Sequence, residues 1–313
     1  MIRMESGKMT GNKIEDDSIM SMKKAYIEGK EILAGAGIDE ADLDAWYLLE
    51  YVTGITKARY YMDPDQKMSE DADRKYKECL EKRKNHIPLQ HITGTQEFMG
   101  LEFLVNENVL IPRQDTEVLV EEALHMISKD QSVGDSSFQL LDMCTGSGCI
   151  LLSVMHYAEQ RGISIKGTGV DFSEEALVVA KKNEEHLRNG QNDGKGKISW
   201  ILSDLFENVS ETYDMILSNP PYIRTAEIEK LQDEVKLHDP FSALDGKEDG
   251  LYFYKKIIAD AKQFLKENGV LAFEIGYDQG KAVSNLMKEV GYAKVFVKKD
   301  LAGLDRIVCG VYY

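Results

Sequence analysis

Three short segments carry residue types and spacings that could bind a nucleoside-like ligand and a planar amino group. The first is the loop from Cys144 to Gly148, which directly follows the apolar segment Phe138–Met143. Small residues let the backbone approach a ligand that a Cβ would block. The pattern is not GxGxxG, because Cys144 holds the first glycine position, so a pyrophosphate site is weakly supported. A ligand with a carboxylate and an amine fits at least as well, and a tight turn between strand and helix explains the loop equally well.

The second segment is Gly169-Val170-Asp171, where an apolar run ends in a carboxylate. An acidic residue at the end of the second strand of such a unit can accept hydrogen bonds from ribose hydroxyls. Asp171 or Ser173 could equally serve as the N-cap of the next helix. Together, the loop and Asp171 favour a cofactor that contains a nucleoside.

The third segment, Asn219-Pro220-Pro221-Tyr222, follows the apolar run Met215–Leu217. Two prolines fix the backbone and remove two N–H donors, which leaves nearby carbonyls available as acceptors. Asn219 adds a side-chain oxygen, and Tyr222 adds a flat aromatic face. The combination predicts a receptor for a planar –NH₂ group. A purely structural Pro-Pro turn is the weaker interpretation, because the motif ends a strand in line with the other two segments.

Alternating segments must position these three sites from residue 113 onward. Helices are predicted after four of the strands, which indicates an α/β fold with a doubly wound parallel sheet and ligands at the carboxyl ends of its strands. The last two strands have no helix between them and should pair antiparallel at one edge. The predicted strands are Phe138–Met143, Ile165–Val170, Ile198–Leu202, Met215–Leu217, Val270–Ile275, Ala293–Val297 and Arg306–Val311, and the predicted helices are Thr116–Ser128, Cys149–Gln160, Ser173–Asn189, Leu251–Glu267 and Gln279–Val290.

The part of the chain before residue 113 has a different character. Residues 22–86 show the 3.6-residue apolar spacing of helices, and Ser69 is expected to cap a helix over Glu70–Asn85. The apolar residues from Phe98 to Ile111 predict two short strands with turns. We therefore expect a flexible leader at 1–20, a helical domain at 21–96, a β-hairpin linker at 97–112 and an α/β domain at 113–313.

The composition and net charge of the chain exclude several classes of protein. The chain has 313 residues, 43% of them hydrophobic, which is enough for packed cores. Lys and Arg number 38 against 54 Asp and Glu, a net charge of −16, and this argues against a protein whose main grip is on phosphate backbones. The four cysteines form no CxxC pair, so no metal site is expected. No apolar stretch resembles a signal peptide or a membrane span, and we expect a cytoplasmic protein.

These segments resemble the class I methyltransferases that use S-adenosylmethionine, and within them the peptide chain release factor glutamine methyltransferases. The resemblance covers the chain from about residue 30 to the end. Asn-Pro-Pro-Tyr alone is shared with adenine and guanine amino-methyltransferases, but its combination with a Pro-Arg-Gln-Asp-Thr-Glu segment and a helical N-terminal domain is far more specific. Cys144 and Leu205 depart from the family pattern. The supporting segments are Ile111–Glu117, Cys144–Gly148, Asp171, Asn219–Tyr222, Leu244–Gly246, Asp249–Leu251, Phe273–Gly276 and Asp300–Arg306.

The resemblance implies a mostly parallel seven-stranded sheet and S-adenosylmethionine as the cofactor. It implies that the loop 144–148 wraps the methionine part, Asp171 holds the ribose, Asp204 and Leu205 border the adenine, and the Asn-Pro-Pro-Tyr motif holds a glutamine amide. The implied cofactor-binding residues are Cys144, Thr145, Gly146, Ser147, Gly148, Asp171, Asp204, Leu205 and Asn219. The implied substrate-binding residues are Asn219, Pro220, Pro221 and Tyr222, of which Asn219, Pro220 and Tyr222 are assigned to catalysis.

The expected activity is methylation of the side-chain amide nitrogen of the glutamine in the Gly-Gly-Gln motif of release factors. The helical domain should recognise the factor, with no nucleic acid or membrane involved and the enzyme acting as a monomer. An adenine methyltransferase acting on nucleic acid is the alternative enzyme, which the negative charge disfavours. A non-catalytic binding module is a further alternative. Arg113 and Glu117 fit a helix start as well as a substrate contact.

Overall fold

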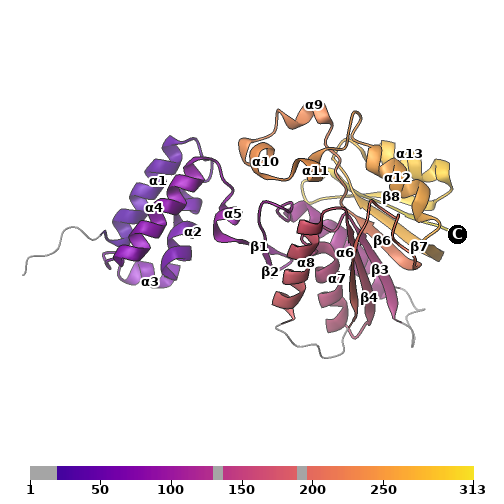
Figure 1. The fold of residues 1–313 in the computed structure, drawn as a ribbon, viewed down its shortest axis with the longest axis horizontal. Coiled ribbons are helices and arrows are strands. Elements are labelled where there is room, and N and C mark those ends of the chain that lie inside the picture. The colour runs from indigo at the N-terminus through magenta and orange to yellow at the C-terminus, as the bar shows by residue number, and fades with distance from the viewer. Residues whose placement is uncertain (1–19, 130–136, 189–195) are drawn as a thin grey trace, which may run out of the picture. The chain divides into compact units, whose positions relative to one another are not determined.

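The first part of the chain forms a bundle of helices with its own core. The computed structural model describes residues 20–129, 137–188 and 196–313, so the predicted leader at 1–20 lies outside these ranges except for its last residue. The core of the bundle contains Trp46, Tyr60 and Tyr76, and all of its members come from residues 20–92. The helices are α1 (Met22–Gly35), α2 (Ala41–Thr53), α3 (Lys57–Met62), α4 (Glu70–Lys84) and α5 (Leu89–Thr93) (Figure 1).

Side-chain caps and one buried ion pair hold this bundle together. The hydroxyl of Ser69 accepts a hydrogen bond from the backbone N–H of Ala72, so the predicted N-cap of α4 is confirmed. Arg83 on α4 donates to the carboxylate of Asp44 on α2 at 2.6 Å, and both side chains are less than a tenth exposed. Loss of either partner would leave a buried charge unpaired, which typically costs about 3–5 kcal/mol.

The second compact unit begins at Gly94, directly after α5, with a hairpin of β1 (Thr95–Phe98) and β2 (Leu101–Leu104). Phe98 pairs with Leu101, so Met99 and Gly100 alone make the turn, with φ values of 53° and 68°. Positive φ at both positions is the type I′ geometry that matches strand twist. The predicted linker boundary at 96/97 therefore falls inside β1.

The predicted extension of the hairpin to Ile111 is wrong. No strand follows β2 before residue 113, because the chain bends at Asn106, whose side-chain oxygen accepts from the N–H of Asn108 at 3.0 Å. Val105 and Val109 instead pack against Ala176 and Val179. The apolar spacing that indicated a strand thus reflects contact with a neighbouring helix.

The rest of this unit is built on a seven-stranded sheet with the order β5-β4-β3-β6-β7-β9-β8. Neighbouring strands from β5 to β7 run parallel, whereas β9 pairs antiparallel with both β7 and β8. The predicted antiparallel edge pair is confirmed. The strands are β3 (Phe138–Met143), β4 (Ile165–Asp171), β5 (Ile198–Leu202), β6 (Tyr213–Ser218), β7 (Leu265–Glu274), β8 (Ala293–Lys299) and β9 (Asp305–Val311).

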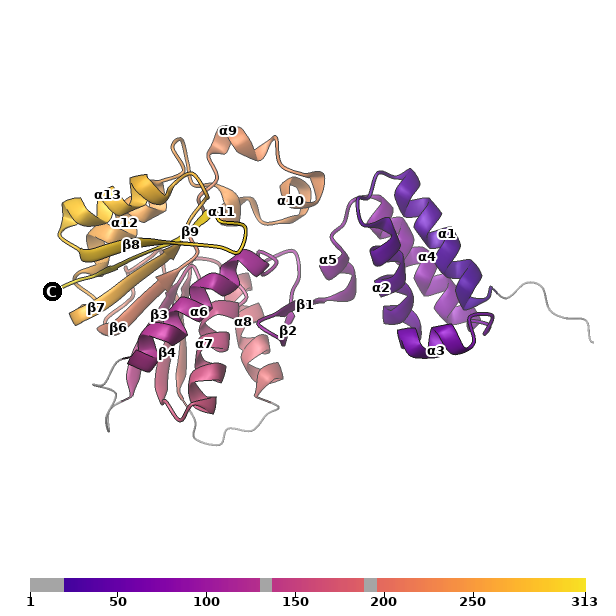
Figure 2. The same cartoon turned by 180° about the vertical axis from the view of Figure 1, so that it is seen from behind.

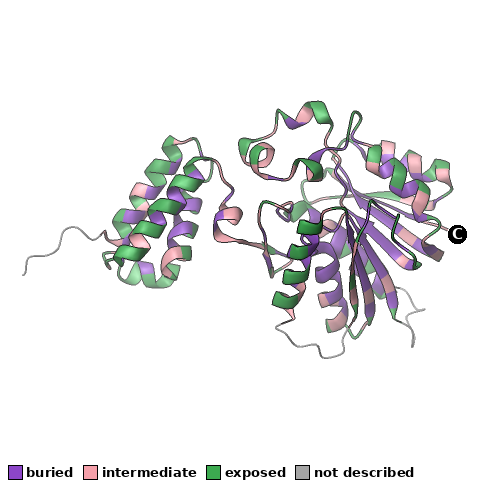
Figure 3. Ribbon diagram, viewed as in Figure 1, coloured by how far each residue is buried: buried purple, intermediate pink, exposed green. Residues whose placement is uncertain are grey.

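Helices cover both faces of this sheet, which confirms the doubly wound α/β prediction. The helices α6 (Gln114–Lys129), α7 (Cys149–Gln160) and α8 (Glu174–Leu187) lie together on one side, and α12 (Tyr252–Ala261) and α13 (Gly280–Val290) lie on the other (Figures 1 and 2). Alternate residues of one strand serve the two cores: Ile307 and Cys309 face one and Val308 the other. The central strands are accordingly buried along most of their length (Figure 3).

Two predictions in the second half differ from the structure. The helix expected over Leu251–Glu267 ends at Ala261, and β7 already begins at Leu265. Leu265 continues the apolar spacing of α12, but it pairs with Tyr213 in the sheet, and a register shift between Tyr213 and Met215 accommodates the residues that follow Leu265. Between β6 and α12 the chain also forms three short helices that are not among the predicted helices given above: α9 (Thr225–Ile228), α10 (Asp233–His238) and α11 (Phe241–Leu244).

Within residues 20–129, 137–188 and 196–313, no helix combines the length and the apolar character that crossing a bilayer requires.

Candidate active site

A cavity of about 270 Å³ opens where β3, β4, β5 and β6 end. This is the edge at which the sequence placed its three chemical segments, and the structure brings all three together there. Gly148, Pro220 and Tyr222 are the predicted site residues that do not line the cavity. Those that do line it are Cys144, Thr145, Gly146, Ser147, Asp171, Asp204, Leu205, Asn219 and Pro221.

The loop after β3 uses several of its own backbone donors internally. The N–H of Thr145 donates to the carbonyl of Val170 at 2.9 Å, and the N–H of Gly148 donates to the carbonyl of Thr145 at 2.8 Å. The N–H of Gly146 donates to Asp171 Oδ2 at 2.9 Å. Since these donors are already bound, the loop is poorly suited to cradle a phosphate.

Asp171 closes this loop from the neighbouring strand. Besides Gly146, it accepts the N–H of Ser173 through Oδ1 at 2.9 Å, and Ser173 itself caps α8. Burial raises the pKa of Asp171, against the N–H groups of Ser173 and Gly146, which lower it. Each carboxylate oxygen has a further lone pair, so Asp171 can still accept from a ligand hydroxyl.

Both departures from the family pattern occupy strained backbone positions. Cys144 has a φ of 62° and Leu205 a φ of 49°, in the left-handed region that glycine adopts without penalty. Gly148 also lies in this region, with a φ of 80°, and a Cβ there would come within 2.9 Å of the Trp200 ring. Gly148 is the N-cap of α7 and lies against Trp200, and it is not part of the cavity lining.

A second carboxylate lies beneath the loop. Asp142, at the end of β3, is fully buried and accepts the Thr145 hydroxyl at 2.6 Å. Burial raises the pKa of Asp142 to about 7, and hydrogen bonding by Thr145 opposes that shift. The other oxygen, Oδ1, is buried and has no hydrogen-bond partner within the described ranges. Asp171 and Asp204, by contrast, line this end of the cavity.

The Asn-Pro-Pro-Tyr segment forms the other end of the site. Ser218, the last residue of β6, donates to the carbonyl of Met143 at 2.7 Å and so joins this strand to the loop after β3. Asn219 is half-buried on the cavity wall, and its Nδ2 donates to Oγ1 of Thr116 in the first turn of α6 at 3.4 Å. Pro220 and Pro221 are buried.

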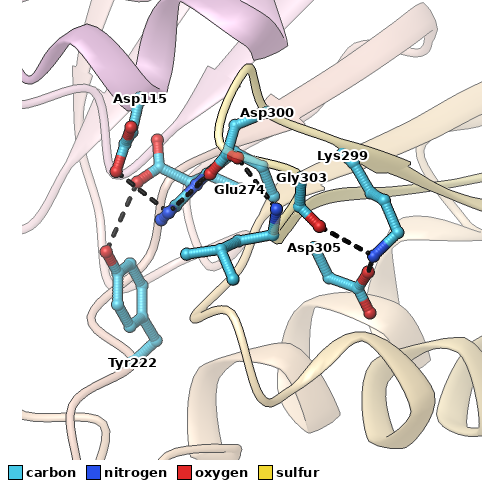
Figure 4. Close-up of polar contacts among 9 residues, drawn as sticks. Asp115, Tyr222, Glu274, Lys299, Asp300, Gly303 and Asp305 are labelled. Carbon is cyan, nitrogen blue, oxygen red and sulfur yellow. Dashed lines mark hydrogen bonds and ion pairs between the residues drawn. The ribbon is translucent and has the colours of Figure 1, made fainter.

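Tyr222 turns its hydroxyl away from the cavity toward the buried end of β7. It donates to Oε1 of Glu274 at 3.4 Å (Figure 4). Burial raises the pKa of Tyr222, so its hydroxyl remains protonated and available as a donor. Its backbone carbonyl accepts from Nε2 of Gln279 at 3.0 Å. Through these two contacts, Tyr222 fixes the conformation of the Asn-Pro-Pro-Tyr motif.

Sequence reasoning missed two parts of the cavity wall. Residues 107–110, which fall within the predicted hairpin linker, line the cavity, as do Pro240, Ser242 and Ala243 around α11. Arg113 donates to Asp239 at 2.7 Å and so ties the start of α6 to the second of these segments. Glu117 accepts the N–H of Met99 at 2.7 Å, which is a structural contact with the hairpin.

No group of His, Cys, Asp and Glu side chains is arranged to hold a metal ion in the part of the chain that the structure describes. The cysteines are free thiols, and three of them, Cys79, Cys149 and Cys309, are buried.

A mostly parallel seven-stranded sheet in this order, with an Asp-closed loop after β3 and Asn-Pro-Pro-Tyr after β6, defines a class I methyltransferase. The sequence matches the family models of the PrmC N-terminal domain over residues 24–94 and of the methyltransferase small domain over residues 117–300. The chain belongs to the release factor glutamine methyltransferase family, as its similarity to curated relatives shows.

The release factor glutamine methyltransferase of Caulobacter vibrioides is 38% identical over 293 residues, covering 93% of this chain and 96% of the relative. That of Clostridium botulinum is also 38% identical over 293 residues, covering 92% of this chain and 98% of the relative. Among solved structures, a release factor-specific protein-(glutamine-N5) methyltransferase from Alicyclobacillus acidocaldarius is 29% identical, with a TM-score of 0.37, and the match covers 67% of this chain and 98% of the other.

Proposed function

We propose that this protein transfers the methyl group of S-adenosylmethionine to the side-chain amide nitrogen of the glutamine in the Gly-Gly-Gln motif of release factors. The observation that carries the proposal is the position of Asn219. Its side chain lies on the cavity wall at the end of β6, and its Nδ2 is bound by Thr116. Its Oδ1 is then the atom best placed to accept a hydrogen from an incoming –NH₂ group.

The chemistry of the cavity fits the cofactor. S-adenosylmethionine carries a ribose diol, an ammonium group and a sulfonium, and when bound it supplies an electrophilic methyl group on the positively charged sulfur. Asp171 retains acceptor capacity for the diol, and the carboxyl groups of Asp171 and Asp204 on the cavity wall suit positive charge. The loop amides that a pyrophosphate would need are already occupied.

The protein's own residues act mainly by positioning the substrate. An amide nitrogen is a poor nucleophile because its lone pair is delocalised into the carbonyl. On the cavity wall, Asn219 Oδ1 would accept one of the two amide hydrogens and direct the nitrogen toward the methyl group. Orientation can contribute at most about 7–11 kcal/mol to the barrier. No strong general base is required, because the methylated nitrogen is far more acidic and releases its proton to water.

Recognition of the release factor is assigned to the helical unit. The relatives are named release factor glutamine methyltransferases, and the sequence of this unit matches the N-terminal domain model of the family. The net charge of −16 supports a protein partner over nucleic acid. We also propose that the enzyme is a monomer and that it acts in the cytoplasm, where release factors act.

The test is incubation of the full chain with a release factor and S-adenosylmethionine labelled in the methyl group, followed by peptide mapping. The expected result is one labelled residue, the glutamine of Gly-Gly-Gln. A release factor with that glutamine replaced by alanine is the matched control and should remain unlabelled.

Parallel reactions contain a duplex DNA and an RNA in place of the factor. Label on adenine in either nucleic acid, with none on the factor, would replace this proposal with the nucleic acid methyltransferase. Cofactor binding without transfer to any of these substrates would equally refute it.

A further inference from the structure

The last residue of the Asn-Pro-Pro-Tyr segment is held by a side chain from another part of the chain. Gln279, the N-cap residue of α13, is 4% exposed. Its Nε2 donates to the backbone carbonyl of Tyr222 at 3.0 Å and to that of Gly250 at 3.2 Å. Its Oε1 accepts the backbone N–H of Gly276 at 2.9 Å. One buried amide therefore joins the end of the motif, the residues before α12 and the residues that follow β7.

These three partners fix the orientation of the Gln279 amide. Both carbonyl oxygens lie against its nitrogen, and the backbone N–H lies against its oxygen. A turned-over amide would place oxygen against two carbonyls and nitrogen against an N–H, so all three hydrogen bonds would be lost. Glutamine does not titrate, so the donor and acceptor roles in this contact do not change with pH.

Two glycines allow the backbone to come close enough for these contacts. Gly250 has a φ of 72°, and a Cβ there would lie 2.5 Å from the carbonyl oxygen of Tyr222 and 2.8 Å from Nε2 of Gln279. A Cβ at Gly246 would lie 2.8 Å from the backbone of Tyr222. Only a residue without a side chain fits such approaches. The N–H of Gly246 also donates to the carbonyl of Ile223 at 2.8 Å, so the segment 246–250 packs directly on the end of the motif.

The segment from Asn219 to Tyr222 is short and stiff, because its two prolines have fixed φ angles. The sheet holds its first end, since β6 pairs with both neighbouring strands up to the residue before Asn219. Gln279 holds its last residue. A stiff segment that is held at both ends keeps Asn219 at one place on the cavity wall. Release of the Tyr222 end would allow Asn219 to shift.

We propose that Gln279 is a positioning residue for methyl transfer, which fixes the Tyr222 end of the motif and so keeps Asn219 in place for the acceptor –NH₂ group. The inference rests on the proposed function for the identity of that group. Within the described ranges, the cavity lining includes Asn219 but not Gln279, so Gln279 acts through the motif.

The first test is Gln279→Glu in the full chain. The new side chain keeps the shape and the acceptor for Gly276, but it cannot donate to both carbonyls. Single-turnover methyl transfer to a release factor, at saturating S-adenosylmethionine, should be about 10-fold or more slower, since misplacing a reacting group can cost roughly 100-fold. Calorimetric titration should show unchanged affinity for S-adenosylmethionine, because Gln279 does not line the cavity.

Met287→Ala on the same helix is the control for stability. Met287 is fully buried in the core on one side of the sheet, so its truncation lowers the free energy of unfolding and leaves the hydrogen bonds of Gln279 in place. Unfolding in urea measures the stability of both variants. At a temperature where it is folded, Met287→Ala should transfer the methyl group at the wild-type rate.

A second pair of variants tests the same contact from the opposite side. Gly250→Ala introduces a Cβ that would push the Gln279 amide away from Tyr222. Gly162→Ala is the matched control, because Gly162 has a similar φ of 76° and a Cβ there would meet no heavy atom within 4 Å. The backbone strain is thus alike in the two variants. Gly250→Ala should slow methyl transfer about as much as Gln279→Glu, and Gly162→Ala should transfer at the wild-type rate.

Hydrogen exchange detects the contact without catalysis. The N–H of Ile223 donates to the carbonyl of Leu244 at 3.0 Å, and the N–H of Gly246 donates to the carbonyl of Ile223. Relative to the amides of β6, these two amides should exchange faster in Gln279→Glu and Gly250→Ala than in the wild type. In Met287→Ala and Gly162→Ala, their exchange relative to β6 should match the wild type.

Transfer at the wild-type rate by Gln279→Glu and Gly250→Ala would overturn the inference. Equal losses of rate in the two control variants would also overturn it, because they would indicate a general effect of stability or strain. A loss of cofactor affinity in Gln279→Glu that accounts for its slower turnover would place the residue in cofactor binding instead. A wild-type protein that fails to methylate the factor refutes the proposed function, and the exchange of Ile223 and Gly246 then decides whether Gln279 holds the motif.

Discussion

Asp171 and Gly146 are hydrogen-bonded to each other, carboxylate to backbone N–H, at 2.9 Å. This bond joins the loop after β3 to the end of β4. The sequence assigns these two segments to different parts of one cofactor, and both line the cavity. The acid that should hold the ribose also sets the shape of the loop that should hold the methionine part.

Asp171→Ala should weaken binding of S-adenosylmethionine by roughly 10- to 100-fold. The ribose loses a charged acceptor, a contact that contributes about 1.5–3 kcal/mol, and the N–H groups of Gly146 and Ser173 lose theirs. Calorimetric titration measures the affinity. Glu185→Ala, which removes an exposed acid from α8, is the control for net charge. Equal affinity in Asp171→Ala and wild type would show that the ribose is held elsewhere.

Asn219→Ala should lower kcat by roughly 100-fold or more, as loss of one oriented polar group does in other active sites. Cofactor affinity should change little. Asn219→Asp keeps an acceptor oxygen and should retain partial activity, although it can no longer donate to Thr116. Single-turnover transfer at saturating cofactor separates chemistry from binding. Transfer by Asn219→Ala at the wild-type rate would reduce the motif to a structural turn.

Asp142 should make stability depend on pH. Its pKa rises from 3.8 to about 7 on folding, so the folded protein binds its proton more tightly than the unfolded chain does. The stability this group contributes is complete below about pH 4 and is lost as the pH rises through 7. A tenfold difference in proton affinity between the folded and unfolded chains corresponds to about 1.4 kcal/mol.

Asp142→Asn removes this titration and keeps an acceptor for Thr145. The free energy of unfolding of both proteins is measured in urea at pH 5 and pH 8. Between these two values, the variant should become more stable relative to the wild type by a few kcal/mol. A constant difference between the two proteins across this range would contradict the raised pKa.

Removing the helical unit should separate cofactor binding from substrate recognition. All residues of its core come from positions 20–92, so a chain that starts at Gly94 keeps both cores of the sheet intact. We expect it to bind S-adenosylmethionine normally and to methylate an intact release factor poorly. A short peptide with Gly-Gly-Gln should be methylated equally slowly by both chains. Normal rates on the intact factor would place recognition outside the helices.

Much of this architecture was accessible from local patterns. The bounds of β3 and α7 were predicted to the residue, because a buried strand followed by a small-residue turn and a helix leaves a clear apolar record. The positions of Asp171 and Asn219 at one edge followed from the parallel sheet alone. The end of α12 was not predictable, since Leu265 fits the helical period and the choice of strand depends on its pairing with Tyr213.

The sequence could not indicate contacts between residues that lie far apart in the chain and belong to no recognisable motif. Thr116 and Asn219 lie 103 positions apart, and nothing in their local sequence relates the two. Their contact arises only when the first turn of α6 meets the residue that follows β6. The wall formed around Pro240 is similar, because it depends on the contact of Asp239 with Arg113.

The insertion of β9 between β7 and β8 has a consequence for biosynthesis. A ribosome delivers β7 and β8 before β9, so β7 must wait with an open edge until residues 305–311 emerge. Exposed strand edges invite pairing with other chains. Arg306, which forms an ion pair with Asp115 in the first turn of α6, arrives in that same final segment. A nascent chain can therefore assemble the loop that closes on Asp171 early, but the ion pair that ties the start of α6 to the sheet forms only when the last strand is in place.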